Sequence, residues 1–185
     1  MSNLSGKLLI AMPGMSDPRF EYSVVFLCDH SPERAMGLIV NKPSDAVRFD
    51  ELLEQLGIDR APGARDIRVF FGGPVEMGRG FVLHSRDEDD REVTLPVDER
   101  FGMTATLDIL EDLARGEGPK RAIFALGYAG WGPGQLEDEI LQNGWLTCDA
   151  SPDLVFRDDS GGLWEAAIRS LGIDPLLLSA SAGHA

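Results

Sequence analysis

The 185-residue sequence predicts a single α+β domain in which about four helices flank a mixed β-sheet. Short apolar runs typical of strands dominate the first half, and helix-like stretches occur among them without strict strand–helix alternation. The length corresponds to about one domain, and no internal repeat, low-complexity block or change of composition marks a linker. We therefore expect one domain over residues 1–178, followed by a flexible tail of small and polar residues over 179–185.

The first three strands are predicted from apolar runs that are rich in branched side chains. Each run is bounded by Gly, Pro, Asp or Asn and is too short for a stable helix. The runs are Lys7–Met12, Ser23–Cys28 and Met36–Val40. Because they are almost continuously apolar, we expect these strands to be covered on both faces of the sheet.

A helix is predicted next, because four apolar residues recur at the i, i+3, i+4 and i+7 spacing of an amphipathic helix. These residues are Phe49, Leu52, Leu53 and Leu56. Gly57 follows at the place where a glycine commonly ends a helix. Ile67–Phe71 and Gly80–Ser85 are interpreted as a strand pair joined through Gly72-Gly73-Pro74, and the charged run over 86–91 as a solvated loop.

The second half of the chain predicts three more helices and two strands. In chain order they are the helix Leu107–Ala114, the strand Arg121–Leu126, the helix Gln135–Gln142, the strand Trp145–Cys148 and the helix Leu163–Leu171. Thr106 is a plausible N-cap of the first of these helices, with Asp108 in its first turn. Gly172 ends the last one.

The excess of acidic over basic residues limits the classes of molecule that the chain is expected to bind. The chain has 17 Lys and Arg residues against 31 Asp and Glu residues, which gives a net charge of −14. A field of this sign repels DNA, RNA and anionic membranes. The nearest approach to a basic patch along the sequence is the Lys120-Arg121 pair, so we expect no local patch that would reverse this effect. Direct nucleic-acid binding and membrane association are therefore disfavoured.

Cysteine usage and the absence of targeting signals predict a cytoplasmic protein. Only two cysteines occur, Cys28 and Cys148, which fits a compartment where thiols stay reduced. The first residues lack the basic start and apolar run of a signal peptide. No apolar stretch approaches the ~20 residues that a membrane-spanning helix needs.

Five sequence blocks carry a family resemblance. They are LLIAMPGM at 8–15, MGLIVNKP at 36–43, FGGPV at 71–75, GFVLHS at 80–85 and GYAGWGPGQLEDEILQNGW at 127–145. With these blocks, the chain resembles the AlgH/YqgE family of bacterial proteins from about residue 8 to residue 172. The resemblance implies a strongly bent mixed sheet that partly closes into a barrel. It brings a provisional label of transcriptional regulator, but no established biochemical function and no agreed catalytic residues. His30 and His84 match the family pattern, whereas Cys28 and Cys148 do not.

The most distinctive segment is a glycine-rich turn between a predicted strand and a predicted helix. Its glycines are Gly127, Gly130, Gly132 and Gly134. A strand–loop–helix arrangement of this kind can present backbone N–H groups to a phosphate. However, no Lys-Ser or Lys-Thr follows, Pro133 lacks an N–H, and acidic residues occupy 137–139. Two interpretations stay open: tight packing around Trp131, or a site for a neutral or cationic ligand or a partner's backbone.

The turn at Phe71–Val75 adds a second glycine pair, which permits close approach of another chain segment. This turn is either a tight strand connection or one wall of a cleft whose other wall is the segment 127–135. Polar residues then join the two turns in the candidate ligand- or partner-binding site. The predicted site residues are Asn41, Lys42, Gly72, Gly73, Pro74, His84, Gly127, Gly130, Trp131, Gly134 and Gln135.

The preferred hypothesis is a non-enzymatic cytoplasmic protein that binds an unknown protein partner or small ligand and regulates indirectly. The alternative is an enzyme that uses His84 with Asn41 or Lys42 in the cleft. Cys28 and His30, at i and i+2, offer a nucleophile and a base, and the ordinary alternative for His30 is a structural histidine. We expect no metal site, because neither His-Glu-x-x-His nor clustered Cys and His occurs, and no cofactor. A monomer or weak homodimer is expected.

Overall fold

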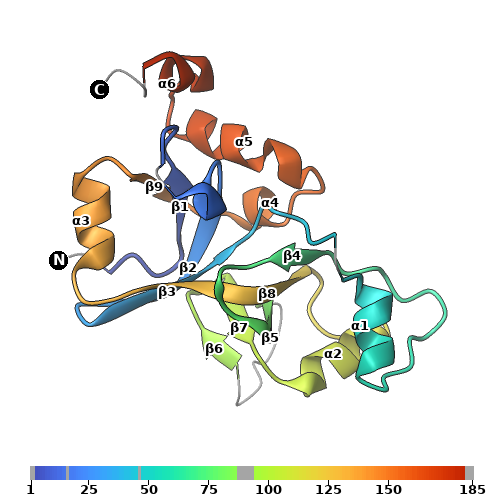
Figure 1. Cartoon of the computed structure of the whole chain (residues 1–185). Coiled ribbons are helices and arrows are strands. Elements are labelled where there is room, and N and C mark those ends of the chain that lie inside the picture. Colours follow the sequence, from blue (N-terminus) through green and yellow to red (C-terminus); the bar gives the residue numbers. More distant parts are fainter. Residues whose placement is uncertain (1–2, 16, 46, 87–93, 182–185) are drawn as a thin grey trace.

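The computed structural model describes residues 3–15, 17–45, 47–86 and 94–181 (Figure 1). The strands are β1 (Lys7–Ala11), β2 (Val24–Ser31), β3 (Arg34–Ile39), β4 (Val69–Phe71), β5 (Val75–Ser85), β6 (Thr94–Pro96), β7 (Phe101–Thr104), β8 (Ala122–Trp131) and β9 (Trp145–Asp149). The α-helices are α1 (Phe49–Gln55), α2 (Leu107–Ala114), α3 (Gln135–Leu141), α4 (Pro152–Val155), α5 (Leu163–Ser170) and α6 (Pro175–Ser181). Two 3₁₀ turns, η1 (Pro18–Phe20) and η2 (Ser160–Gly162), complete these elements.

The strands form one curled, mixed sheet, as the sequence and the family resemblance predict. Across the described residues its order is β6-β7-β5-β8-β3-β2-β1-β9, and β4 pairs with β8 outside this path. The β4–β8 pair is parallel, and the other strand pairs are antiparallel. The sheet bends into a half-barrel with helices around it, so the predicted α+β class is confirmed (Figure 1).

The first strands are buried on both faces, as their continuous apolar sequence predicts. In β1, Leu8 and Ile10 join the main core, which α5 closes through Trp164. Leu9 and Ala11 point to the other face, where they pack in a second core with Leu136 of α3. Since successive residues of a strand point to opposite faces, one apolar run fills two cores.

A third core lies under α1 and α2, which lie together at one end of the sheet (Figure 1). Phe49 and Leu53 of α1 and Leu110 of α2 pack there against Phe124 of β8. Both helices match their predicted ranges to within a residue. The predicted N-cap Thr106 does precede α2, but its hydroxyl makes no capping hydrogen bond.

The predicted β4–β5 pair is wrong, because these strands lie on opposite edges of β8. The connection between them must therefore cross β8. A Cβ on Gly73 would lie 2.1 Å from the backbone carbon of Tyr128, and one on Gly72 would lie 2.3 Å from the carbonyl oxygen of Gly127. Close packing at this crossing thus explains three of the glycines, Gly72, Gly73 and Gly127. We call the site, together with Tyr128, the glycine crossing.

The predicted glycine-rich turn is also shorter than expected. β8 continues through Gly127 and Gly130 to Trp131, so the turn before α3 consists of Gly132, Pro133 and Gly134. The strand continues because Ala129 and Trp131 pair with β3 and bury their side chains under α3. Strand pairing and burial outweigh the weak intrinsic strand preference of glycine.

Several elements have no counterpart in the prediction, namely β6, β7, α4 and α6. Helix α6 includes residues 179–181 of the expected tail, whereas 182–185 lie outside the described residues. Residues 87–91 of the predicted charged loop also lie outside them. Among the described helices, none has the length and apolar character needed to cross a membrane.

Candidate functional site

A cleft of about 540 Å³ lies where β8 meets α3, beside η1 and the beginnings of β5 and β9. We call it the aromatic cleft, and its defining side chains are Asp17, Phe20, Trp131, Gln135, Glu139 and Trp145. Its volume falls in the range of ~300–1,000 Å³ that is usual for small-molecule sites. Pro74, from the turn at Phe71–Val75, and Gly130, near the end of β8, line it as well.

The apolar part of the cleft is a row of three aromatic rings. The ring centroids of Phe20 and Trp145 are 5.8 Å apart at an interplanar angle of 76°. Those of Trp131 and Trp145 are 6.0 Å apart at 78°. These edge-to-face arrangements fix each ring against the next. The row is therefore a rigid apolar wall.

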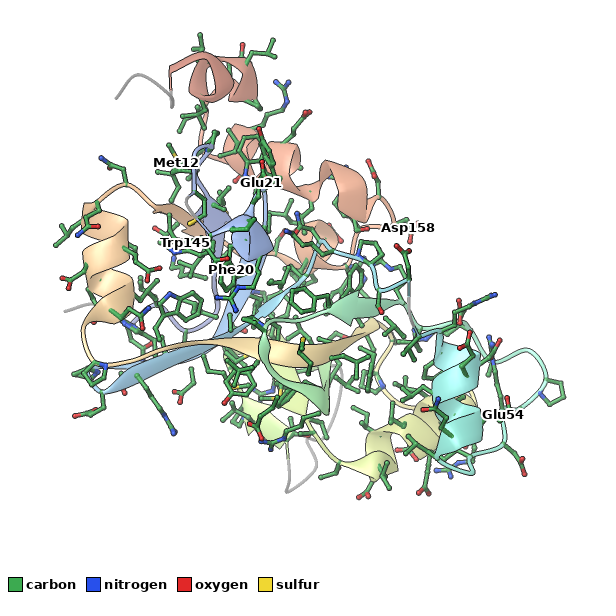
Figure 2. The ribbon with its side chains drawn as sticks, in the orientation of Figure 1. Met12, Phe20, Glu21, Glu54, Trp145 and Asp158 are labelled. Atoms are coloured by element: carbon green, nitrogen blue, oxygen red, sulfur yellow. The ribbon has the colours of Figure 1, made fainter. Side chains whose placement is uncertain are left out.

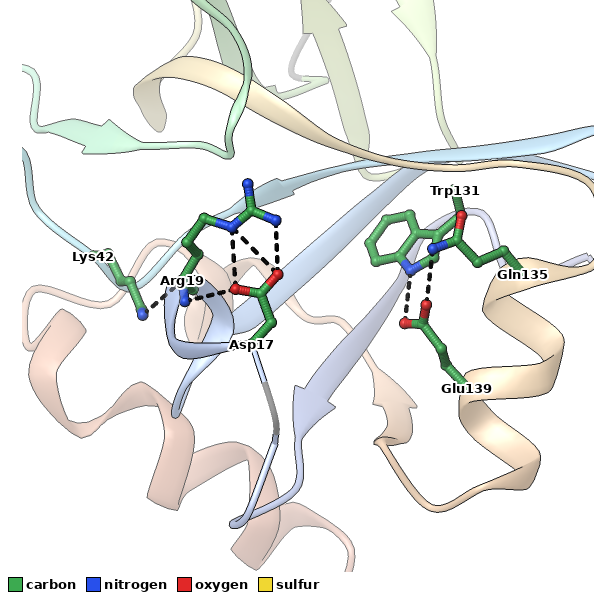
Figure 3. A network of polar contacts seen from close by, with 6 residues as sticks. All are labelled: Asp17, Arg19, Lys42, Trp131, Gln135 and Glu139. Carbon is green, nitrogen blue, oxygen red and sulfur yellow. Dashed lines mark hydrogen bonds and ion pairs between the residues drawn. The ribbon is translucent and has the colours of Figure 1, made fainter.

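Glu139 is the polar centre of the cleft. Its Oε1 accepts hydrogen bonds from the indole N–H of Trp131 at 3.1 Å and of Trp145 at 2.9 Å. Its Oε2 accepts one from the side-chain amide of Gln135 at 3.0 Å, as Figure 3 shows in part. A carboxylate has about four acceptor positions, so three described donors leave one position for a ligand.

Gln135 is itself held in place, because its Oε1 accepts the backbone N–H of Gly132 at 3.0 Å. Gln135 and Glu139 stand four residues apart on α3, which places them on the same helix face. The short Gly132–Gly134 turn thereby fixes the side chain that supports Glu139. The donors around the carboxylate are preorganised rather than mobile.

An ion pair from the η1 segment forms the opposite wall (Figure 3). The Arg19 guanidinium binds Asp17 with Nη2 at 2.8 Å and Nε at 3.1 Å from its carboxylate oxygens. These hydrogen bonds lower the pKa of Asp17. The backbone carbonyl of Arg19 accepts a hydrogen bond from Lys42 Nζ at 3.2 Å. With Arg19 matched by Asp17, the carboxylate of Glu139 leaves the cleft with one net negative charge.

The structure separates the other predicted polar residues from this cleft. Asn41 and Lys42 line a second cleft with Tyr22 and Trp164. The Asn41 side chain accepts the N–H of Val24 at 2.9 Å and donates to the carbonyl of Tyr22 at 2.9 Å. Asn41 therefore fixes the chain that leads into β2. Burial lowers the pKa of Lys42.

The predicted grouping of His84 with Asn41 and Lys42 is wrong. His84 lies in β5, is 4% exposed, and is paired in the sheet with Gly102 and Ala122. Its Nε2 is 2.8 Å from the hydroxyl of Thr104 and its Nδ1 is 3.0 Å from the carbonyl of Ser85. His84 is therefore buried in the sheet with a polar partner at each ring nitrogen, as is typical of a structural histidine.

The Cys28–His30 pair does not form either, because a β-bulge between Leu27 and Asp29 interrupts the alternation of β2. Cys28 points into the main core, where burial raises its pKa to about 12. His30 points toward α3, with its Nε2 3.6 Å from the carboxylate of Glu137. A thiol with this pKa is a poor nucleophile near neutral pH.

The remaining predicted site residues are glycines that shape the backbone and do not line the aromatic cleft. Gly72, Gly73 and Gly127 form the glycine crossing behind the cleft, and Gly134 is the N-cap of α3 with a φ of 71°. Sequence reasoning missed Asp17, Phe20, Glu139 and Trp145 as site residues. For Glu139 a signal existed: two tryptophans near α3 need acceptors for their N–H groups, and a carboxylate at i+4 from Gln135 can supply them.

Within the described ranges, no three His, Cys, Asp or Glu side chains gather into a set that could hold a metal ion. The arrangement in the aromatic cleft is one of hydrogen-bond donors, one carboxylate and aromatic rings. It can recognise a ligand without a nucleophile or an acid–base pair.

Comparisons with known proteins agree with the fold and the sequence blocks. A family model described as AlgH-like matches residues 8–176. A UPF0301 protein of Ruegeria pomeroyi is 63% identical over 99% of this chain and 100% of its own length, and one of Cereibacter sphaeroides is 61% identical over 99% and 100%.

Two solved structures are similar. The solution structure of the AlgH protein from Pseudomonas aeruginosa has 43% identity and a TM-score of 0.79, covering 100% of this chain and 97% of its own. Protein DIP2367 from Corynebacterium diphtheriae has 22% identity and a TM-score of 0.77, covering 97% and 93%, and shares the fold. The predicted resemblance is confirmed, and the chain belongs to the AlgH-like family.

Proposed function

We propose that the chain is a non-enzymatic binding protein of the cytoplasm whose recognition site is the aromatic cleft. It binds a small ligand with a cationic, hydrogen-bond-donating head, or a partner's side chain of the same chemistry. Regulation would follow from this binding, through the partner or ligand rather than through direct contact with DNA.

The observation that carries the proposal is the environment of Glu139. Its carboxylate is held by two indoles and one amide and keeps one acceptor position. A fixed carboxylate beside aromatic faces is suited to a cation, because the rings attract positive charge and the carboxylate pairs with it. The net negative charge of the whole chain attracts the same class of ligand.

Two probes distinguish the forms of this ligand. Agmatine represents a small guanidinium compound, and an N-acetylated, C-amidated arginine represents a partner's side chain. Isothermal titration with each probe measures affinity, and tryptophan fluorescence reports contact with Trp131 and Trp145. We expect at least one probe to bind and to change the fluorescence. N-acetylated, C-amidated citrulline, whose side-chain urea is uncharged, should bind at least about tenfold more weakly than the matched arginine probe, which corresponds to about 1.4 kcal/mol.

The variant Glu139→Gln tests the site. It removes the charge and should weaken probe binding by about tenfold or more. The matched control is Glu54→Gln, the same change on the exposed side of α1, far from α3 (Figure 2). Equal affinities in wild type and Glu139→Gln, or no binding of either probe, would contradict the proposal.

A further inference from the structure

A second cleft, of about 380 Å³, gathers much of the positive charge of this acidic chain. Its wall comes from three segments, which are residues 65–68, 120–122 and 153–158. Five of the 17 basic residues line it, against three aspartates, so it carries two positive charges in excess. The basic residues are Arg65, Arg68, Lys120, Arg121 and Arg157. Residues that are distant in the sequence meet here, so the sequence alone does not show this grouping. We call this the basic cleft.

The parallel pairing of β4 with β8 explains how the cleft forms. Parallel strands begin at the same edge of a sheet, so the residues that precede β4 and those that precede β8 lie side by side. The N–H of Phe124 donates to the carbonyl of Arg68 at 2.9 Å, and the Arg65 guanidinium donates to the carbonyl of Pro119. The segment after α4 closes the third side, near the labelled Asp158 (Figure 2).

Among the described residues, the guanidinium groups of Arg68 and Arg157 have no carboxylate within 3.5 Å of their nitrogen atoms. Arg68 donates to the backbone carbonyls of Phe156 and Asp158, both at 3.2 Å, and burial lowers its pKa. In the described part of the chain, the buried Nε of Arg157 has no acceptor, and its Nη2 lies 3.9 Å from Asp159. A buried donor without an acceptor is costly, so an incoming anion would be stabilised here.

We propose that the basic cleft binds a small ligand through a phosphoryl group. Guanidinium groups match the geometry of phosphoryl oxygens, and several of them around one cleft suit a multiply charged anion. The cleft is lined by three chain segments, and the acidic surface elsewhere disfavours a long polyanion. This site is independent of the aromatic cleft.

The test is isothermal titration of the full chain with inorganic phosphate, pyrophosphate and glycerol phosphate, in buffer without other oxyanions. The inorganic arms and the ester arm separate free phosphate from an organic phosphate ligand. We expect saturable binding with one site per chain and a melting temperature that rises with ligand concentration. Citrate at matched ionic strength should bind at least about tenfold more weakly than the best phosphoryl compound.

Arg157→Gln is the primary variant, because its side chain is 32% exposed and its ion pair with Asp159 is long, at 3.9 Å. It should weaken phosphoryl binding by about tenfold. Arg121→Gln provides a second variant at an exposed position, where the side chain forms an ion pair with Asp153 at 2.7 Å. Arg34→Gln, at the exposed start of β3, removes the same charge and should leave affinity within about twofold. No binding, equal binding in Arg157→Gln, stronger binding of citrate, or tighter binding of an oligothymidylate than of pyrophosphate would overturn the proposal.

Discussion

At the scale of single residues, burial decides which polar side chains are available for function. His84 and Cys28 carry reactive groups, yet both are buried within the sheet, with exposures of 4% and 3%. Glu139 carries an ordinary carboxylate but lies in a cleft among fixed donors. From residue type alone, the histidine and the cysteine are stronger candidates for a functional site than the glutamate. The sequence shows which chemical groups are present but not how deeply each one is buried.

The Cys28 thiol predicts a loss of stability at alkaline pH. Burial raises its pKa from 9.0 to about 12, so above pH 9 the unfolded chain releases this proton while the folded chain keeps it. The free energy of unfolding should therefore fall between pH 9 and about 12, by up to about 1.4 kcal/mol per pH unit from this group. Urea denaturation at a series of pH values measures it.

Other groups also titrate in this range, so the relevant quantity is the difference between wild type and Cys28→Ala. The variant will be less stable at neutral pH because a buried sulfur is lost. Its stability should nevertheless depend less on pH above 9. Parallel pH profiles for the two proteins would show that the thiol has no such effect.

At the scale of elements, the glycine crossing predicts sharply different tolerance of alanine at two glycines. In Gly73→Ala the new Cβ would lie 2.1 Å from the Tyr128 backbone, so we expect a loss of about 3 kcal/mol or more in the free energy of unfolding. Gly78→Ala, in β5, has no atom within 4 Å and should change it by less than about 0.5 kcal/mol. Chemical denaturation compares them, and equal losses would refute the crossing as the reason.

The helix N-caps give a second matched pair. Ser151 accepts the N–H of Leu154 at 3.1 Å in α4, whereas the Thr106 hydroxyl makes no capping bond in α2. Ser151→Ala should cost about 1 kcal/mol, and Thr106→Ala should cost clearly less. Thermal melts of both variants check this order. A larger loss in Thr106→Ala would mean that its hydroxyl acts in another way.

Sequence patterns predicted those elements whose apolar signal is strong. The strands β1 to β3 are continuous apolar runs, and the helices α1, α2 and α5 have apolar residues at helical spacing. The strands β6 and β7 have three and four residues, and α4 has four, which are too few to show a period. In the site, Trp131 and Gln135 came from the distinctive sequence block. Asp17 and Phe20 could not be found, because only tertiary packing brings η1 to α3.

At the scale of the whole molecule, the net charge of −14 predicts that salt stabilises the fold. Self-repulsion among the carboxylates weakens as ions screen it. Raising NaCl from about 50 mM to about 500 mM should raise the melting temperature by a few degrees. KCl should act equally, which separates screening from specific ion binding. A melting temperature that falls with both salts would contradict this expectation.

The glycine crossing has a consequence for the order in which the chain can fold. The turn at Gly72 and Gly73 lies against residues 127 and 128, more than fifty positions later in the sequence. During synthesis the ribosome releases β1 to β5 before β8 exists, so β4 and β5 lack their shared partner. The chain loses conformational entropy when it closes a loop of this length, before the strand pairs can stabilise it. This cost slows folding. Assembly of the half-barrel therefore awaits a late strand, and a nascent chain that stops before residue 122 lacks the strand that joins β3, β4 and β5.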